Sequence, residues 1–310
     1  MPCTSLWRRA GRLMRRTSPC TRIMGGRPAE RCRSEALFFT LNASNWVMST
    51  ESLYRLVRLS NIMTTIANNL QQVMGRIAQA CQAAGRDPAQ IELLPVTKFF
   101  PASDVAMLYR LGHRAFGEAR EQEAARKVAE VRELTGVQAP ITGERPITWH
   151  MIGQIQRNKA KSIAAWADTV HSVSSERVVA ALDRARAAVL GKGVRTEPLG
   201  VYVQVSLDGD TERGGVDVGD PAAIDALCDQ VAGASALRLL GVMGVPPLEA
   251  DPDAAFARLA AEHRRVLRGH PEATGLSAGM SSDLEVAVKH GSTCVRVGTA
   301  LLGRRPLTSP

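Results

Sequence analysis

The chain has no apolar run approaching the roughly 18 residues that a transmembrane helix needs, so we expect no membrane-spanning segment. Its six cysteines form no C-x-x-C pair, and no group of histidines and cysteines has the spacing of a zinc site. Scattered single cysteines are typical of a reducing compartment, so we expect cytoplasmic localisation. No G-x-G-x-x-G sequence follows the first predicted strand, which argues against a dinucleotide-binding open sheet.

Acidic residues are scarce in the first sixty positions, where eleven arginines and no lysine stand against three glutamates. This segment therefore carries a net charge of +8, whereas the remaining 250 residues hold 28 basic and 27 acidic groups. A nucleic-acid-binding protein needs a basic face on its folded part. We therefore expect no nucleic-acid partner.

The basic segment resembles an organelle transit peptide in composition, because it is rich in arginine and free of acid until Glu30. The alternatives are a disordered basic tail and an upstream extension that the mature protein does not need. We predict that residues 1–62 are a dispensable extension without packed structure. The domain would then occupy residues 63–310, with Met63 as a natural start.

A regular pattern begins near residue 64, where apolar residues recur at helical spacing from Ile66 to Cys81 and Gly85 ends the helix. Strand and helix patterns then alternate to the end of the chain. The predicted helices include 120–134, 176–190, 221–233 and 253–268. The predicted strands are 91–99, 113–119, 147–153, 169–174, 199–207, 238–246, 275–280 and 293–303.

Eight apolar strands with helices between them indicate an α/β protein whose parallel sheet is buried on both sides. Eight strands also close a (β/α)8 barrel, which typically needs about 250 residues. We therefore predict a single (β/α)8 TIM barrel with an extra N-terminal helix, and a doubly wound open sheet is the alternative. In such a barrel the chemistry lies at the C-terminal ends of the strands.

The last two strand ends are suited to bind phosphate, because barrels often use the loops after strands seven and eight for this purpose. Gly279, Ser281 and Ser282 follow the seventh predicted strand, and a helix capped by serine or aspartate opens there. Gly298 and Thr299 stand where the eighth strand ends. Glycines allow backbone N–H groups to approach an anion, and hydroxyls add donors. A capped helix and a glycine turn without any ligand remain the alternative.

Lys98 ends the first predicted strand, "IELLPVTKF", in an otherwise apolar run. A lysine at a strand end is often simply solvated. A partly desolvated lysine instead has a lowered pKa and becomes a nucleophile toward an aldehyde. Phosphate and aldehyde on one small molecule suggest pyridoxal 5′-phosphate. Arg296 could then face the ring nitrogen or the phosphate, or could point outward to a helix carboxylate.

Six segments together resemble the pyridoxal-phosphate homeostasis protein family (YggS/PROSC type), over about residues 64–304. The combination is highly specific, whereas any one piece is not. The segments are "LLPVTKFFP", "FGEAREQE", "WHMIGQIQRNKAK", "VQVSLDGDTERGGV", "LLGVMGVPP" and "GMSSDLEVAVKHGSTCVRVGTALLG". The resemblance implies a barrel like the N-terminal domain of alanine racemase, with the cofactor held as a lysine aldimine.

The resemblance also assigns the residues of a cofactor site. Lys98 matches the Schiff-base lysine, and Arg296 matches an arginine beside the pyridine. Met243 matches a position near the ring. The phosphate cradle would comprise Ser281, Ser282, Gly298 and Thr299. Residues that line the site would include His150, Gly153, Asn158 and Lys159.

One position departs from the family pattern, because Ala119 stands where the second motif usually has asparagine. Any hydrogen bond from that asparagine to the cofactor is therefore absent. Glu118 or Arg120 could reshape that edge of the site.

A racemase needs a second base on the other face of the substrate carbon. In alanine racemase this base is a tyrosine from a second domain, and only four residues follow "LLGRRP" here. The three tyrosines are Tyr54, Tyr109 and Tyr202, and His150 is a geometric substitute. We therefore expect a protein that holds and delivers pyridoxal phosphate to apoenzymes, without catalysis. A racemase-like enzyme and an aldolase-like barrel for a phosphorylated sugar are the alternatives. The sequence does not distinguish a monomer from a weak dimer.

Overall fold

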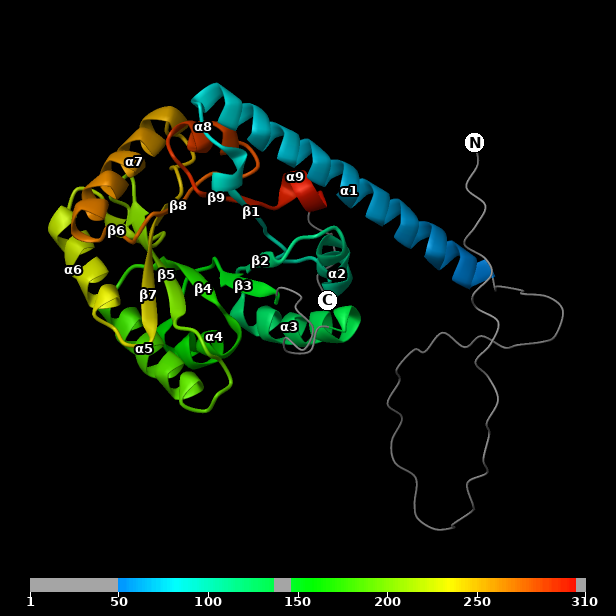
Figure 1. Cartoon of the computed structure of the whole chain (residues 1–310), viewed down its shortest axis with the longest axis horizontal. Helices are drawn as coiled ribbons and strands as arrows, with labels where there is room; N and C mark the ends of the chain where they lie inside the picture. The colour runs from blue at the N-terminus through cyan, green and yellow to red at the C-terminus, as the bar shows by residue number, and fades with distance from the viewer. Residues whose placement is uncertain (1–49, 137–145, 305–310) are drawn as a thin grey trace, which may run out of the picture. The chain divides into compact units, whose positions relative to one another are not determined.

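The computed structural model describes residues 50–136 and 146–304, and Figure 1 shows their arrangement. Residues 1–49 of the predicted extension, which include Cys3, Cys20 and Cys32, lie outside the described residues. Cys81, Cys228 and Cys294 are buried and unpaired.

Eight parallel strands form the barrel, as the sequence predicted. In the order in which they pair around the sheet they are β1 (Glu92–Pro95), β9 (Cys294–Val297), β8 (Gly275–Ser277), β7 (Leu237–Gly244), β5 (Leu199–Ser206), β4 (Thr169–Val173), β3 (Thr148–Met151) and β2 (Ala115–Glu118). A single bridge from Val96 to Gly117 joins the two ends of this order, so the barrel is nearly closed. The short strand β6 (Val216–Asp217) pairs with the end of β5.

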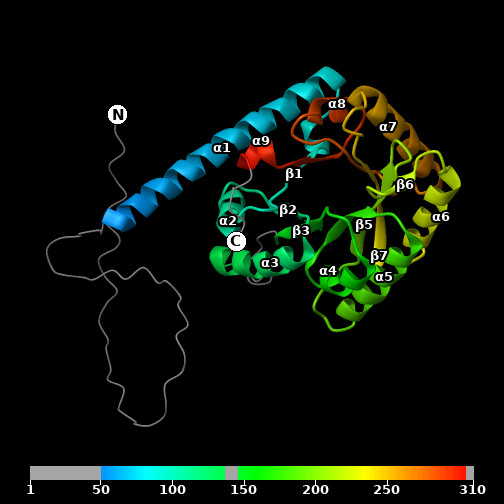
Figure 2. The ribbon, with the colours of Figure 1, turned by 180° about the vertical axis from the view of Figure 1, so that it is seen from behind.

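Helices form a layer around the strands, which both views show (Figures 1 and 2). Asp220 and Asp251 accept hydrogen bonds from backbone N–H groups at the starts of α6 and α7, and each of these helices begins with proline. The helices of this layer are α2 (Ala102–Arg110), α3 (Glu121–Thr135), α4 (Ala160–Trp166), α5 (Glu176–Leu190), α6 (Pro221–Ala232), α7 (Pro252–Gly269), α8 (Leu284–Lys289) and α9 (Thr299–Leu302). Two 3-10 turns, η1 (Pro88–Gln90) and η2 (Arg157–Lys159), accompany them.

The extra N-terminal helix, α1 (Thr50–Ala84), begins earlier than the sequence predicted. The backbone of residues 50–62 is therefore helical, and the absence of packed structure before about residue 60 stays a prediction. Residues 50–63 contain neither glycine nor proline, so no residue there stops a helix that has started further along the chain.

The predicted strand 293–303 is wrong in its second half, because Thr299–Leu302 forms α9. A short apolar run does not distinguish a strand from a buried helix, and Gly298 separates the two elements. The predicted side-chain cap of α8 is also absent. Asp283 occupies the N-cap position, but its carboxylate accepts a hydrogen bond from the Met280 N–H at 2.6 Å.

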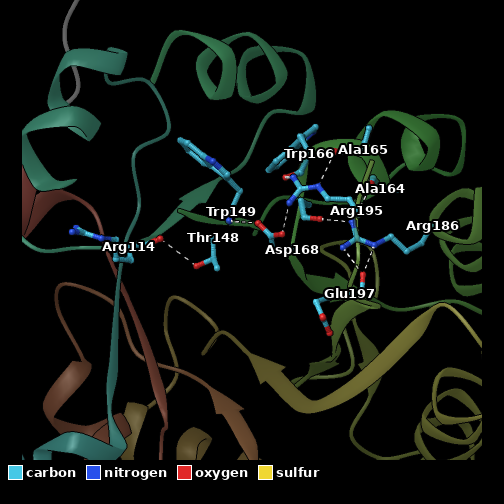
Figure 3. Close-up of polar contacts among 11 residues, drawn as sticks. Arg114, Thr148, Trp149, Ala164, Ala165, Trp166, Asp168, Arg186, Arg195 and Glu197 are labelled. Atoms are coloured by element: carbon cyan, nitrogen blue, oxygen red, sulfur yellow. Dashed lines mark hydrogen bonds and ion pairs between the residues drawn. The ribbon is translucent and has the colours of Figure 1, made fainter. Parts of the chain in front are cut away.

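The end of α4 is fixed by two arginines, which Figure 3 shows. Arg186 on α5 is 1% exposed, and it donates to the carbonyls of Ala164, Ala167 and Glu197 at 2.8–3.0 Å. Arg195 forms an ion pair with Asp168 at 2.5 Å and donates to the carbonyls of Ala165 and Trp166. Together they satisfy carbonyls that the helix end leaves without intrahelical partners. The orientation of α4 against α5 is therefore well defined.

Helix α1 supports the last two helices of the barrel. Asn69 donates to the Leu301 carbonyl of α9 at 3.0 Å, and Arg76 forms a two-pronged ion pair with Glu285 of α8 at 2.6 and 2.9 Å. Ile66 is the first buried apolar residue of α1 within the side chains that the structure describes. Among the described side chains, the half-buried Ile62 also packs against the core, and the buried and hydrogen-bonded contacts of α1 follow it.

We predict that deletion of residues 1–62 leaves the midpoint of urea unfolding within about 0.3 M of the full-length value. The reason is that the contacts of Ile66, Asn69 and Arg76 all remain. A deletion of residues 1–78 removes these contacts and serves as the control, and it should lower the midpoint clearly. Equal loss of stability in both truncations would show that the domain begins earlier than residue 63.

Candidate functional site

Lys98 lies in the turn between β1 and α2, three residues beyond the last residue of β1, and is half-buried. Its amino group is 5.9 Å from the centroid of the Phe99 ring and makes no hydrogen bond or ion pair with the described chain. The Val96 N–H donates to the Val297 carbonyl at 2.9 Å, which places the end of β1 beside the end of β9. Pairing of the first and last strands therefore brings Lys98 next to the Gly298 turn.

The turn that carries Lys98 has an unusual backbone. Phe99 has φ of 70°, which is a left-handed conformation that a bulky side chain rarely adopts. The Arg120 guanidinium lies 4.7 Å from the centroid of the Phe99 ring, and Arg120 is itself paired with Glu123 at 2.8 Å. Such strain persists where surrounding contacts hold it, and it is typical of functional turns.

Glu118 holds the same turn from the helix side of the sheet. Its carboxylate accepts hydrogen bonds from the Thr97 hydroxyl at 2.6 Å and from Lys127 of α3 at 2.7 Å. Lys127 also donates to the Thr97 carbonyl at 2.8 Å. Burial raises the pKa of the Glu118 carboxyl, and the Lys127 charge opposes that shift. Glu118 therefore supports the turn through Thr97, the residue before Lys98. Arg120, which follows Ala119, contacts the turn through the Phe99 ring.

The loops after β8 and β9 meet, as the sequence predicted for an anion site. The Ser281 hydroxyl accepts a hydrogen bond from the Ala300 N–H at 3.2 Å, which joins the two loops. Gly298 and Thr299 open α9, and Ser282 and Thr299 are exposed. The backbone N–H groups of Ser281, Ser282 and Thr299 find no acceptor in the described chain. Unpaired N–H groups and hydroxyls of this kind fit a phosphate.

Arg296 carries a positive charge inside the barrel. It is 6% exposed, and it donates to the Ser277 hydroxyl at 2.5 Å and to the Gly244 carbonyl at 3.1 Å. Burial lowers the pKa of its guanidinium, and no carboxylate in the described chain is paired with it. A buried charge normally has an ionic partner. The site is therefore suited to a ligand that brings an anionic group or a hydrogen-bond acceptor.

A hydrogen-bonded row of side chains continues from Arg296 across the barrel. Ser277 Oγ lies 2.9 Å from His171 Nδ1, and His171 Nε2 lies 3.0 Å from His150 Nδ1. The Tyr202 ring stacks on His171 with a centroid distance of 4.6 Å. Burial lowers the pKa of both histidines, and the Arg296 charge contributes at His171. Both imidazoles are therefore neutral near pH 7, and the row fixes the position of the guanidinium.

The residues predicted from sequence fall into three places. Met243 pairs in register with Ser277, so it lies with His150 and Arg296 on the inner face of the barrel. Gly153 packs so closely on Ala119 that a Cβ at position 153 would lie 2.0 Å from the Ala119 carbonyl oxygen.

Two other predicted residues lie away from the inner face. Asn158 lines a groove beside η2 and α4, and Lys159 pairs with Glu121 of α3 at 3.5 Å. The contribution of Asn158 to a cofactor site stays a prediction.

Sequence reasoning assigned no site role to His171 and Ser277, and it considered Tyr202 only as a possible second base. Each is a polar or aromatic residue within a predicted apolar strand, which was the available signal. The signal was weak because a sequence alone does not say which side of a strand faces the barrel interior.

A model of the alanine racemase N-terminal domain family matches residues 63–306. The chain belongs to this family. A pyridoxal phosphate homeostasis protein of Mycobacterium leprae is 59% identical over 253 residues, which cover 82% of this chain and 96% of the relative. A protein of the same name from Escherichia coli K12 is 35% identical over 78% of this chain and 98% of its own length. The resemblance inferred from the motifs is therefore confirmed.

Solved structures agree with this assignment. PipY of Synechococcus elongatus with PLP bound is 33% identical and has a TM-score of 0.60, over 74% of this chain and all of that one. Alanine racemase of Clostridium difficile has a TM-score of 0.55 at 16% identity, so it supports the fold alone. The chain covers 58% of that racemase.

No helix within 50–136 or 146–304 has the length and apolarity to cross a membrane. In the same ranges no cluster of three or more His, Cys, Asp or Glu side chains could hold a metal ion.

The two inner histidines predict a dependence of stability on pH. Their pKa values in the folded protein lie below the ordinary value of 6.5, so below about pH 6.5 the unfolded chain binds more protons than the folded one. The free energy of unfolding should therefore fall as the pH drops from 7.5 to 5.5. We predict that His171→Gln reduces this decrease by up to about 1.4 kcal/mol per pH unit.

Urea unfolding at several pH values measures this effect. Tyr202→Phe is the matched control, because it changes the side chain stacked on His171 without removing a group that titrates in this range. The control should change stability without changing the pH slope. An unchanged slope in His171→Gln would contradict the neutral state of the inner row.

Proposed function

We propose that this protein binds pyridoxal 5′-phosphate and takes part in pyridoxal-phosphate homeostasis. The observation that carries the proposal is the buried Arg296, which lacks a carboxylate partner. The neighbouring strand ends present Lys98 and the unpaired N–H groups of the Ser281 and Thr299 loops. The names of the relatives and the PLP-bound PipY support it.

The residues present fit the cofactor. The loops of Ser281, Ser282, Gly298 and Thr299 would hold the phosphate through backbone N–H groups and hydroxyls. Arg296 would donate to an acceptor on the ring, and Met243 and His150 would pack near it. When bound, pyridoxal phosphate supplies an aldehyde that condenses reversibly with an unprotonated amine and releases water. Lys98 would provide that amine, because its amino group has no partner in the described chain.

A role in holding and delivering the cofactor, without catalysis, fits the described tyrosines. Tyr202 is stacked on His171 inside the barrel, and burial raises the pKa of its phenol. Tyr109 is buried on α2, with the Arg114 guanidinium 4.0 Å from its ring centroid. Neither is placed as an exposed second base for racemisation. We further propose PLP-dependent apoenzymes as recipients, a monomer or weak dimer, and a cytoplasmic location.

Visible absorption spectra after addition of pyridoxal phosphate test the proposal. We expect a yellow band that borohydride removes in the parent protein and in Lys289→Ala, which lacks a lysine of α8. The band should be absent in Lys98→Ala. Absence of the band in the parent would contradict the proposed function, and a band in Lys98→Ala would contradict the role of that lysine.

An assay for loss of chirality with several amino acids distinguishes the carrier from the racemase-like alternative. A carrier should racemise no amino acid faster than free pyridoxal phosphate does. Turnover above that level that disappears in Lys98→Ala would favour the enzyme.

A further inference from the structure

A groove of about 660 Å³ lies on the outer face of the barrel between α4 and α5. It begins at η2, which follows β3, and continues to the turn after α5. Of its described lining residues, none is acidic and four are basic. Since the part of the chain after residue 60 is nearly neutral, four cations around one groove are a local concentration of charge. The basic residues are Arg157, Lys161, Arg184 and Lys192.

None of these four cations has an ion pair or a side-chain hydrogen bond within the described chain. Neighbouring cations differ in this respect. Lys159 is paired with Glu121, Arg195 is paired with Asp168, and Arg186 is buried on backbone carbonyls. The four groove cations are exposed and remain available to an anionic partner.

The floor between the cations is apolar. Val194, at one end of the groove, is 62% exposed and adds apolar surface that a partner could cover. Small side chains allow the backbone of a partner helix to approach closely. The other floor residues are Ala160, Ala165, Ala181, Ala185, Ala188 and Val189.

The groove is preformed rather than assembled on binding. Arg186 connects α5 to the carbonyls at the end of α4, and Arg195 does the same from the loop that follows α5 (Figure 3). These bonds fix the spacing of the two helices beneath the groove. A preformed surface loses less conformational entropy when a partner binds.

We propose that this groove binds an acidic amphipathic helix of a partner protein. Arg157 and Lys161 are four residues apart along η2 and α4, and Arg184 and Lys192 flank the opposite side on and after α5. A helix that lies between them would place an apolar stripe on the alanine floor and carboxylates against both rows of cations. This arrangement is that of an amphipathic helix in a groove, with electrostatic complementarity giving specificity.

The groove does not include Lys98, Arg296 or the loops around Ser281 and Thr299. Binding of the partner helix therefore does not require the cofactor. The two proposals can fail independently of each other.

Fluorescence anisotropy with labelled peptides tests the proposal on the full-length protein. The probe is a peptide of about 18 residues of Glu and Leu with Leu at i, i+3, i+4 and i+7 spacing, which is long enough to form a helix. A peptide with Lys in place of Glu is the charge control. We expect the acidic peptide alone to bind, and to bind equally in the presence of pyridoxal phosphate and to Lys98→Ala.

The double variant K161E/R184E should weaken binding about tenfold or more, because it reverses one cation on each side of the groove. The matched control R110E/R132E reverses two exposed arginines of α2 and α3 and should change the affinity less than about twofold. Ala188→Gln puts a longer neutral side chain on the exposed floor and should also weaken binding. Equal affinity for K161E/R184E and the control, or no binding of the acidic peptide, would overturn the proposal.

Discussion

Pairing of the first barrel strand with the last is the constraint on which the site depends. β1 and β9 are about two hundred positions apart in the chain, yet Val96 and Val297 share a backbone hydrogen bond and Leu94 stands in register with Arg296. This pairing places the Lys98 turn beside the Gly298 turn. The bridge from Val96 to Gly117 then closes the other side, so that Glu118 of β2 and Lys127 of α3 support the same turn. Without the pairing of β1 with β9, Lys98 and the loops after β8 and β9 would have no fixed relation.

The polar interior of the barrel follows from Arg296. A guanidinium removed from water without a carboxylate is costly unless its donors are satisfied. Ser277 and the Gly244 carbonyl satisfy part of this requirement, and the neutral His171 and His150 extend the row. Because all these partners are uncharged, the positive charge stays available to a ligand. This is the feature on which the proposed binding of an acceptor-bearing ligand rests.

The sequence predicted the barrel well because strand count and alternation with helices are local patterns. Lys98, Gly298 and Thr299 could be singled out as candidates because barrel chemistry lies at strand ends, and their role stays a prediction. The direction of the side chains was harder to predict. Ser277 and His171 face inward and Glu118 faces α3, and this depends on strand register, which is set by strand pairing and not by local sequence. The sequence predicted a strand for the apolar run after Gly298, which forms α9. Four residues are too few for their periodicity to distinguish a helix from a strand. Asn158 was assigned by resemblance alone, and the fold places it beside the outer groove.

The central claim is that closure of the barrel presents Lys98 to a small aldehyde that carries a phosphate. Mass mapping of the protein after addition of pyridoxal phosphate and reduction with borohydride tests it most directly. We expect one modified peptide, the one that contains Lys98, at stoichiometric cofactor. Modification spread over surface lysines such as Lys161 and Lys192, or confined to another lysine, would contradict it.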